Sequence, residues 1–251
     1  MNDWAVITGA SAGIGRELAT VFARNKFNLV LIARNEKRLE LLAQELESAH
    51  HIEARALPKD LARARVASET FEELRNTPIS VLVNNAGFGS YGPFAQSDLS
   101  LQTEMMQVNM VSLVQLTHLF LQPMLARNNG RILNVASTAG FQPGPLVNVY
   151  YATKAFVYSF SYALAEELAG TGIRVTALCP GMTRTEFFGR AGMRKGKAWL
   201  MMEPREVAEA GYRGLMKGKR VVIPGLLNQI SSFFAKRMPP RLTSAVVKRI
   251  H

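Results

Sequence analysis

The chain of 251 residues is 48% hydrophobic and 20% charged, and its formal net charge at pH 7 is +11. This length suits one large α/β domain, and the composition excludes a disordered chain and favours a compact globule. The charge is uneven, because residues 1–209 hold 21 basic and all 19 acidic residues, whereas residues 210–251 hold nine basic residues and no acid. The basic character therefore belongs to the C-terminal segment.

Cys179 is the single cysteine, which excludes an intramolecular disulfide and is typical of a reducing compartment. Residues 1–4 contain no basic stretch, so we expect no secretory signal and a cytoplasmic protein. Residues 105–126 carry no charge and are numerous enough to cross a bilayer, but polar residues are spread through them. We interpret them as a helix buried on several sides, partly by another subunit, and predict a homodimer or homotetramer.

Strand-like and helix-like segments alternate along the chain. Strands are expected at residues 4–8, 28–33, 54–57, 80–84, 131–135, 174–179 and 220–223. Helices are expected between them, at residues 14–24, 36–48, 62–75, 99–126, 150–169 and 204–216. Most strands are continuous runs of Val, Ile, Leu and Ala, which is typical of parallel strands buried on both faces. The order predicts a single doubly wound, Rossmann-type α/β domain over residues 1–225, with a central parallel sheet of about seven strands and helices on both faces.

A glycine-rich turn, Thr8-Gly9-Ala10-Ser11-Ala12-Gly13-Ile14-Gly15, follows the first expected strand. Glycines allow a tight turn and the close approach of a pyrophosphate, and the next helix offers free N–H groups to the phosphates. An ordinary tight turn would also explain these glycines. The position of the turn in the first β-α unit favours a dinucleotide site.

The second expected strand ends in Ile32-Ala33-Arg34-Asn35, with no acid at the position that usually holds the ribose 2′-hydroxyl of NAD. Arg34 can form charge-assisted hydrogen bonds to the 2′-phosphate of NADP. A solvated surface arginine is the alternative. The missing acid favours NADP(H), with NAD less favoured.

The spacing Gly-x-x-x-Gly-x-Gly in this turn resembles that of the short-chain dehydrogenase/reductase family. Other motifs that resemble those of the family follow in its order over residues 4–190. They are Asp60-Leu61, Asn84-Asn85-Ala86-Gly87, Asn109, Ser137, Tyr150-Tyr151-Ala152-Thr153-Lys154 and Pro180-Gly181-Met182-Thr183-Arg184-Thr185. NADP-preferring members often carry a basic residue inside the glycine turn, where this chain has Ala12. Arg34, helped by Arg16, would then carry the preference.

The resemblance implies an NADP(H)-dependent oxidoreductase that moves a hydride between nicotinamide and a carbonyl or alcohol. The implied catalytic residues are Asn109, Ser137, Tyr150 and Lys154, and no metal is implied. The implied cofactor contacts are Gly9, Ser11, Ala12, Gly13, Ile14, Gly15, Arg34, Asp60, Leu61, Asn85, Ala86, Gly87, Tyr150, Lys154, Pro180, Gly181, Thr183 and Thr185. A catalytically silent NADP-binding sensor or scaffold is an alternative, which the intact catalytic set disfavours.

Tyr150 and Lys154 are four residues apart on an expected helix and share one face. A nearby ammonium favours tyrosinate, so we expect Lys154 to lower the pKa of Tyr150 and make it a general acid/base. Tyr151 is the competing phenol, because it lies three residues from Lys154 and could also approach that face. Only Tyr150 has the spacing of the family that the motifs resemble. Ser137 would hydrogen-bond the substrate oxygen.

The segments expected beyond the strand ends are apolar, with a substrate lid at about residues 183–203. Their apolar residues are Phe88, Tyr91, Phe94, Phe141, Pro143, Pro145, Leu146, Met182, Phe187, Phe188, Met193, Trp199, Leu200, Met201 and Met202. Such walls favour a hydrophobic carbonyl or alcohol substrate. A lid that packs on its own core is the alternative reading.

Residues 226–251 are predicted to form a basic, amphipathic helical extension. Apolar residues recur at helical spacing from Leu226 to Phe234, Pro239-Pro240 breaks the pattern, and a second amphipathic run carries Lys248-Arg249. Basic amphipathic helices can lie on anionic membranes, so a peripheral membrane contact is one hypothesis. Ordinary surface packing and a subunit contact are the others. Nucleic acid is not expected to bind, because no aromatic or groove-reading motif accompanies the charge.

Overall fold

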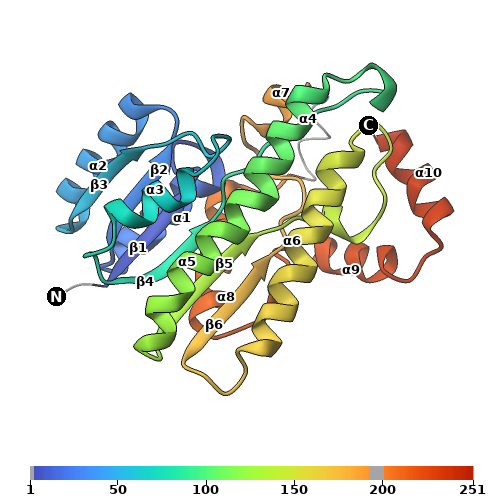
Figure 1. Cartoon of the computed structure of the whole chain (residues 1–251). Coiled ribbons are helices and arrows are strands. Elements are labelled where there is room, and N and C mark those ends of the chain that lie inside the picture. Colours follow the sequence, from blue (N-terminus) through green and yellow to red (C-terminus); the bar gives the residue numbers. More distant parts are fainter. Residues whose placement is uncertain (1–2, 193–200, 251) are drawn as a thin grey trace.

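The computed structural model describes residues 3–192 and 201–250. Its seven strands form one parallel sheet in the order β3-β2-β1-β4-β5-β6-β7, as Figure 1 shows. The strands are β1 (Trp4–Thr8), β2 (Asn28–Ala33), β3 (Ala54–Pro58), β4 (Ile79–Asn84), β5 (Gly130–Val135), β6 (Ile173–Leu178) and β7 (Val221–Val222). Every residue of β1 and β4 is buried, because helices cover both faces of the sheet.

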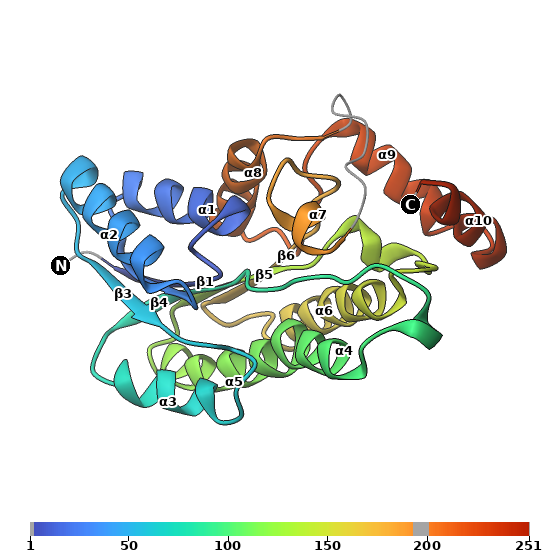
Figure 2. The ribbon, with the colours of Figure 1, turned by 90° about the horizontal axis from the view of Figure 1, so that it is seen from above.

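Two helical layers enclose the sheet (Figure 2). One face is covered by α1 (Gly13–Arg24), α2 (Glu36–His50) and α8 (Pro204–Met216). The other is covered by α3 (Val66–Glu73), α5 (Ser112–Ala126) and α6 (Asn148–Glu167), and α4 (Leu99–Met106) packs against α6. This arrangement confirms the doubly wound fold and its seven strands.

The strand order reverses between β1 and β4, because β1 pairs with both β2 and β4. The loops after these two strands therefore leave the sheet on opposite faces. A crevice at such a switch point is where ligands bind in open parallel sheets.

Two expected helices differ from the structure. The helix expected at residues 62–75 begins only at Val66, because Asp60 Oδ1 accepts the N–H of Ala62 in a turn and Arg65 has a left-handed backbone (φ +67°). The helix expected at residues 99–126 is interrupted by the π-helical segment η2 (Gln107–Val111), which separates α4 from α5.

The chain ends in two helices outside the layers, α9 (Leu226–Ala235) and α10 (Pro240–Ile250), which lie together at one end of the molecule (Figures 1 and 2). The short helices η1 (Phe94–Gln96), η3 (Thr138–Phe141) and α7 (Phe187–Arg190) complete the elements. No helix within residues 3–192 and 201–250 is long and apolar enough to cross a membrane.

Candidate active site

A cleft of about 1800 Å³ lies at the carboxyl ends of the strands and extends to the two C-terminal helices. It is larger than the roughly 300–1,000 Å³ of a site for one drug-sized ligand. The implied site residues that line it are Gly9, Ser11, Ala12, Gly13, Ile14, Arg34, Asp60, Leu61, Asn85, Ala86, Gly87, Ser137, Tyr150, Lys154, Pro180, Gly181, Thr183 and Thr185. Gly15 and Asn109 lie behind this lining.

The glycine turn is fastened to the end of β4. Thr8 Oγ1 accepts the N–H groups of Asn85 and Ala86, both at 3.0 Å. The Asn85 amide in turn donates to Thr8 O at 2.9 Å and to Gly9 O at 3.2 Å. Asn85 therefore supports the turn with its side chain.

The start of α1 fits a phosphate group. Its N-cap, Ala12, supplies no side-chain hydrogen bond, so the first N–H groups of the helix are available to an anion. Gly9 and Gly13 have left-handed backbones, and a Cβ on Gly15 would overlap Gly9 O. The helix can approach the turn this closely only with glycine at position 15, so the residues present fit a dinucleotide.

Two arginines stand at the rim of the cleft beyond β2. Arg34 Nη1 lies 3.4 Å from Glu104 Oε1, and Arg38 Nη1 lies 3.3 Å from both carboxylate oxygens of Glu186. Exposed pairs of this kind are weak, so a 2′-phosphate can compete for either guanidinium. Sequence reasoning missed Arg38, although it lies only four residues after Arg34 in the chain.

Asn109, in η2, connects two segments that border the cleft. Its Oδ1 accepts the N–H of Phe88 at 3.1 Å, and its Nδ2 donates to Phe88 O at 3.0 Å. Nδ2 also donates to Thr153 Oγ1 at 3.1 Å, on α6. Asn109 is buried and therefore positions the loop after β4 against the helix that carries Tyr150.

Tyr150, Lys154 and Ser137 come together at the centre of the cleft. Lys154 Nζ lies 5.8 Å from the centre of the Tyr150 ring and donates to Val135 O at 2.8 Å. Ser137 Oγ accepts the N–H of Ala139 at 3.1 Å and lies within hydrogen-bond reach of Pro180 O. The end of β5, the start of α6 and the turn after β6 thus meet at one point.

Burial dominates the ionisation of this group. Burial raises the pKa of the Tyr150 hydroxyl above its ordinary value, and a hydrogen bond with Ser137 opposes that shift. Burial also lowers the pKa of the Lys154 ammonium to about 8. The expected lowering of the Tyr150 pKa by Lys154 is therefore wrong for this structure, and near neutral pH Tyr150 is a neutral phenol that can donate its proton.

The family model described as short chain dehydrogenase matches residues 3–195. The chain belongs to the short-chain dehydrogenase family. A solved short-chain dehydrogenase from Sphingobium yanoikuyae in complex with NADPH is similar, with a TM-score of 0.86 and 34% identity over 94% of this chain and 93% of that one. The bulky-bulky ketone specific alcohol dehydrogenase from Comamonas testosteroni is similar too, with a TM-score of 0.80 and 30% identity over 94% of this chain and 95% of that one.

Among curated relatives, the very-long-chain 3-oxoacyl-CoA reductase-A of Danio rerio is 37% identical over 190 residues. The match covers 74% of this chain and 60% of that protein, so this short-chain dehydrogenase spans about three fifths of the length of that relative. These findings confirm the family resemblance and agree with the expected oxidoreductase class.

The apolar end of the cleft in this short-chain dehydrogenase is only partly the expected one. Its described apolar lining includes Phe88, Met182, Phe187, Phe188, Met201 and Met202. Phe94 is instead exposed, and Phe141 packs edge-on against Tyr158, with ring centres 5.0 Å apart. Met193, Trp199 and Leu200 lie outside the described residues.

Tyr151, the competing phenol, borders the apolar end with its ring 6.2 Å from that of Tyr150. Burial raises its pKa to about 12. A Cβ on Gly144 would overlap the Tyr151 ring, so glycine at that position admits it.

Sequence reasoning missed the contribution of the C-terminal helices to the cleft. Leu227, Ile230 and Phe234 of α9 and Val246 and Val247 of α10 all line it. The amphipathic pattern predicted these helices, but no signal in the pattern indicated which element they contact. Within the described residues, no group of three or more His, Cys, Asp or Glu could hold a metal ion.

Proposed function

We propose that the protein is an NADP(H)-dependent reductase of a hydrophobic carbonyl compound, which also runs in reverse as an alcohol dehydrogenase. The observation that carries the proposal is the meeting of Tyr150, Lys154 and Ser137 in a cleft whose other end fits a dinucleotide. A bound nicotinamide would supply the hydride.

The chain's own residues then handle the oxygen of the substrate. The neutral Tyr150 hydroxyl donates its proton to the oxygen as the carbonyl is reduced. Ser137 donates a hydrogen bond to the same oxygen and holds it in place. Lys154, as an ammonium with three N–H donors, would bind the nicotinamide ribose. Asn109 is a positioning residue, because its bonds go to Phe88 and Thr153.

NADP(H) is proposed over NAD(H) because two guanidiniums, those of Arg34 and Arg38, stand at the rim beyond β2, where the ribose 2′-phosphate would lie. A similar solved structure holds NADPH. Asp60 and Leu61, which also line the cleft, would contact the adenine end.

A hydrophobic substrate is proposed because aromatic and methionine side chains surround the end of the cleft next to Tyr150. The Phe187 ring contacts that of Tyr150, with ring centres 5.1 Å apart. Two similar proteins are named for a bulky ketone and a very-long-chain acyl group, respectively. Methionine walls adapt to such groups.

Turnover by the Tyr150→Phe variant is the direct test. Loss of the acid should lower kcat for NADPH-dependent reduction of an apolar ketone by about 10²–10⁴-fold, while NADPH binding changes little. The matched control is Tyr151→Phe, whose hydroxyl is not the proton donor and whose kcat should stay within a few-fold of wild type. Equal loss in both variants, or none in Tyr150→Phe, would contradict the proposal.

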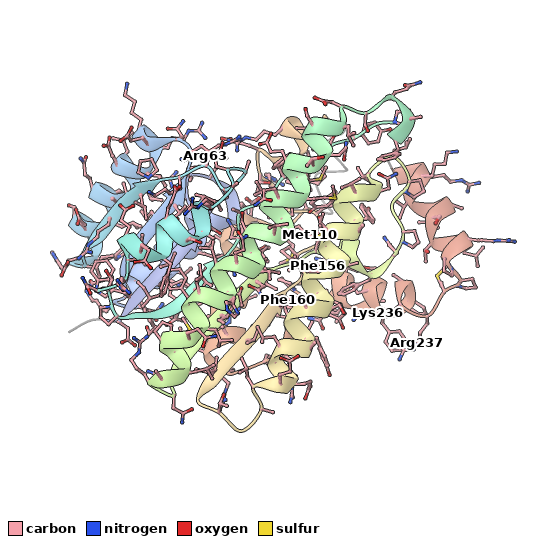
Figure 3. All side chains as sticks on the ribbon, in the orientation of Figure 1. Arg63, Met110, Phe156, Phe160, Lys236 and Arg237 are labelled. Carbon is pink, nitrogen blue, oxygen red and sulfur yellow. The ribbon has the colours of Figure 1, made fainter. Side chains whose placement is uncertain are left out.

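We also propose self-association through α5 and α6. Phe156 and Phe160 stack on α6 with ring centres 6.0 Å apart, and Phe156 is exposed. Figure 3 shows Phe156 and Phe160 along α6, in the same view as Met110 of η2. An exposed apolar face of this kind favours burial by a second subunit.

A further inference from the structure

Helix α9 packs on the domain with its polar side. Asn228 and Ser232 face inward, and Ser232 is buried. The opposite side is apolar and 47–70% exposed. It carries Leu226, Leu227, Ile230, Phe233 and Phe234. A surface helix normally turns its apolar side toward the core and its polar side toward solvent, and α9 has the opposite orientation. Packing against the domain therefore does not explain why one side of α9 is apolar.

The orientation of α9 is held at both ends. Near its start, Asn228 packs so closely on Gly181 that a Cβ there would overlap it, and its amide donates to Pro224 O at 2.8 Å. Just after its end, Lys236 Nζ lies 4.0 Å from the centre of the Phe141 ring and 3.2 Å from Tyr158 Oη. Figure 3 shows Lys236 where α9 meets α6. The helix therefore does not roll to bury its apolar side.

Helix α10 continues the same surface. Val247 and Thr243 are buried, but Leu242 and Val246 are exposed by 54% and 51%. Cations surround the apolar residues of both helices. They are Arg237, whose guanidinium lies 3.6 Å from the centre of the Phe233 ring, and the exposed Arg241, Lys248 and Arg249. The sequence has no acid after Glu209.

We propose that the α9–α10 surface docks on an anionic lipid bilayer. Apolar side chains enter the boundary between headgroups and acyl chains, and the cations meet anionic headgroups. A second copy of the chain is a poorer partner, because a twofold interface would bring the cations of both copies together without an acid from either segment. The charge of the surface thus selects lipid.

Docking also decides what the cleft faces. Leu227, Ile230 and Phe234 belong both to the exposed surface and to the lining of the cleft. The mouth of the cleft therefore opens toward the bilayer, and the substrate is a carbonyl compound dissolved in the membrane. This second statement rests on the proposed reductase function, whereas docking does not.

Vesicle flotation tests docking with the full chain. Phosphatidylcholine vesicles with about 30 mol% phosphatidylglycerol should carry the wild-type protein, and pure phosphatidylcholine vesicles should carry much less. The double variant Phe233→Glu/Leu242→Glu should lower partition into anionic vesicles about tenfold or more. Neither residue lines the cleft. The matched control is Leu41→Glu/Leu99→Glu, on the exposed surfaces of α2 and α4, which should float like wild type.

The role of charge is tested by the double variant Lys248→Glu/Arg249→Glu on α10. Its control is Lys217→Glu/Lys219→Glu, which changes the net charge by the same amount but lies just after α8, away from the proposed docking surface. Only the first pair should lower flotation, and added salt should do the same to wild type. Wild type that floats with neither vesicle, or surface variants that float like wild type, would overturn the inference. So would a change of oligomeric state in Phe233→Glu/Leu242→Glu without a change in flotation, because the surface would then be a subunit contact.

An NADPH titration of each preparation separates the two proposals. Wild-type protein that binds NADPH but does not float would contradict the docking proposal and would not affect the proposed reductase function. Wild-type protein that floats but does not bind NADPH would contradict the proposed function and the membrane-dissolved substrate, and would not affect the docking proposal.

Discussion

Lys154 is a buried cation whose environment makes its charge sensitive to pH near neutrality. Its pKa is lowered to about 8 because burial disfavours the ammonium. The folded state therefore binds fewer protons than the unfolded state between about pH 8 and 10.5, and the contribution of Lys154 to stability rises through that window. Below pH 8 the buried ammonium costs stability, which a ligand that accepts its hydrogen bonds can offset.

The affinity for NADPH should follow this ionisation. We expect the Kd to be constant from pH 7 to about 8 and then to rise by up to about tenfold per pH unit, because only the ammonium binds the ribose in this way. The 2′-phosphate is already ionised over this range, since its second pKa is about 6. Fluorescence titration measures the Kd. Lys154→Met should bind weakly with little pH dependence, and a flat wild-type profile to pH 9.5 would contradict the role of Lys154.

The proposed preference for NADP(H) rests on Arg34, another single residue. Arg34→Asp should weaken NADPH binding about 10–100-fold, since charge-assisted bonds to the phosphate are lost, and should strengthen NADH binding relative to NADPH. The control is Lys37→Asp, which changes the charge equally on the same segment at an exposed position outside the cleft. An equal effect of both variants would show general electrostatics rather than a phosphate site.

At the scale of elements, the π-helical segment η2 decides where Asn109 points. A continuous α-helix over residues 99–126 would give each side chain after η2 a different direction. A π-helical turn contains one residue more than an α-helical turn, and such turns are frequent at functional sites. Here the segment directs Asn109 to both Phe88 and Thr153, which joins the loop after β4 to α6.

Asn109→Ala should therefore lower the free energy of unfolding by about 2–3 kcal/mol, because three hydrogen bonds are lost and the part-buried N–H and C=O of Phe88 lose their partner. Gln107→Ala is the control in the same segment. It removes a single 3.3 Å bond to Ser112 and should cost less than about 1 kcal/mol. Urea unfolding measures both, and equal losses would contradict the special position of Asn109.

At the scale of the whole molecule, exposed apolar residues of the described chain gather on α5 and α6 and on α9 and α10. The two surfaces differ in charge. The segment that forms α9 and α10 contains Arg237, Arg241, Lys248 and Arg249 and no acid, whereas α6 contains Glu166 and Glu167. We therefore assign the first to a second subunit and the second to lipid.

Phe156→Glu should shift the protein toward monomer at micromolar concentration, because it places a charge in the proposed subunit contact. Sedimentation velocity measures the shift. Leu41→Glu, on the exposed side of α2, should leave the oligomeric state unchanged. A wild-type protein that is already monomeric would contradict the proposal.

Much of the fold was predictable because it depends on local patterns. Continuous apolar runs mark strands buried on both faces, and their alternation with helices implies a parallel sheet. The helix boundaries that were predicted wrongly depended on long-range or backbone effects, such as the left-handed backbone of Arg65 and the π-helical turn at Asn109. The strand expected at residues 220–223 pairs only at Val221–Val222.

The sequence by itself determined the family, the doubly wound sheet and the residue types in the candidate site, since spacing along a β-α unit places them at one end of the strands. Only the tertiary structure decided the ionisation of Tyr150 and Lys154, because burial depends on neighbours that are far away in the chain. It also decided which side of α9 faces outward. An amphipathic pattern states that a helix has two sides, but the contacts of Asn228 and Lys236 determine which of them meets the protein.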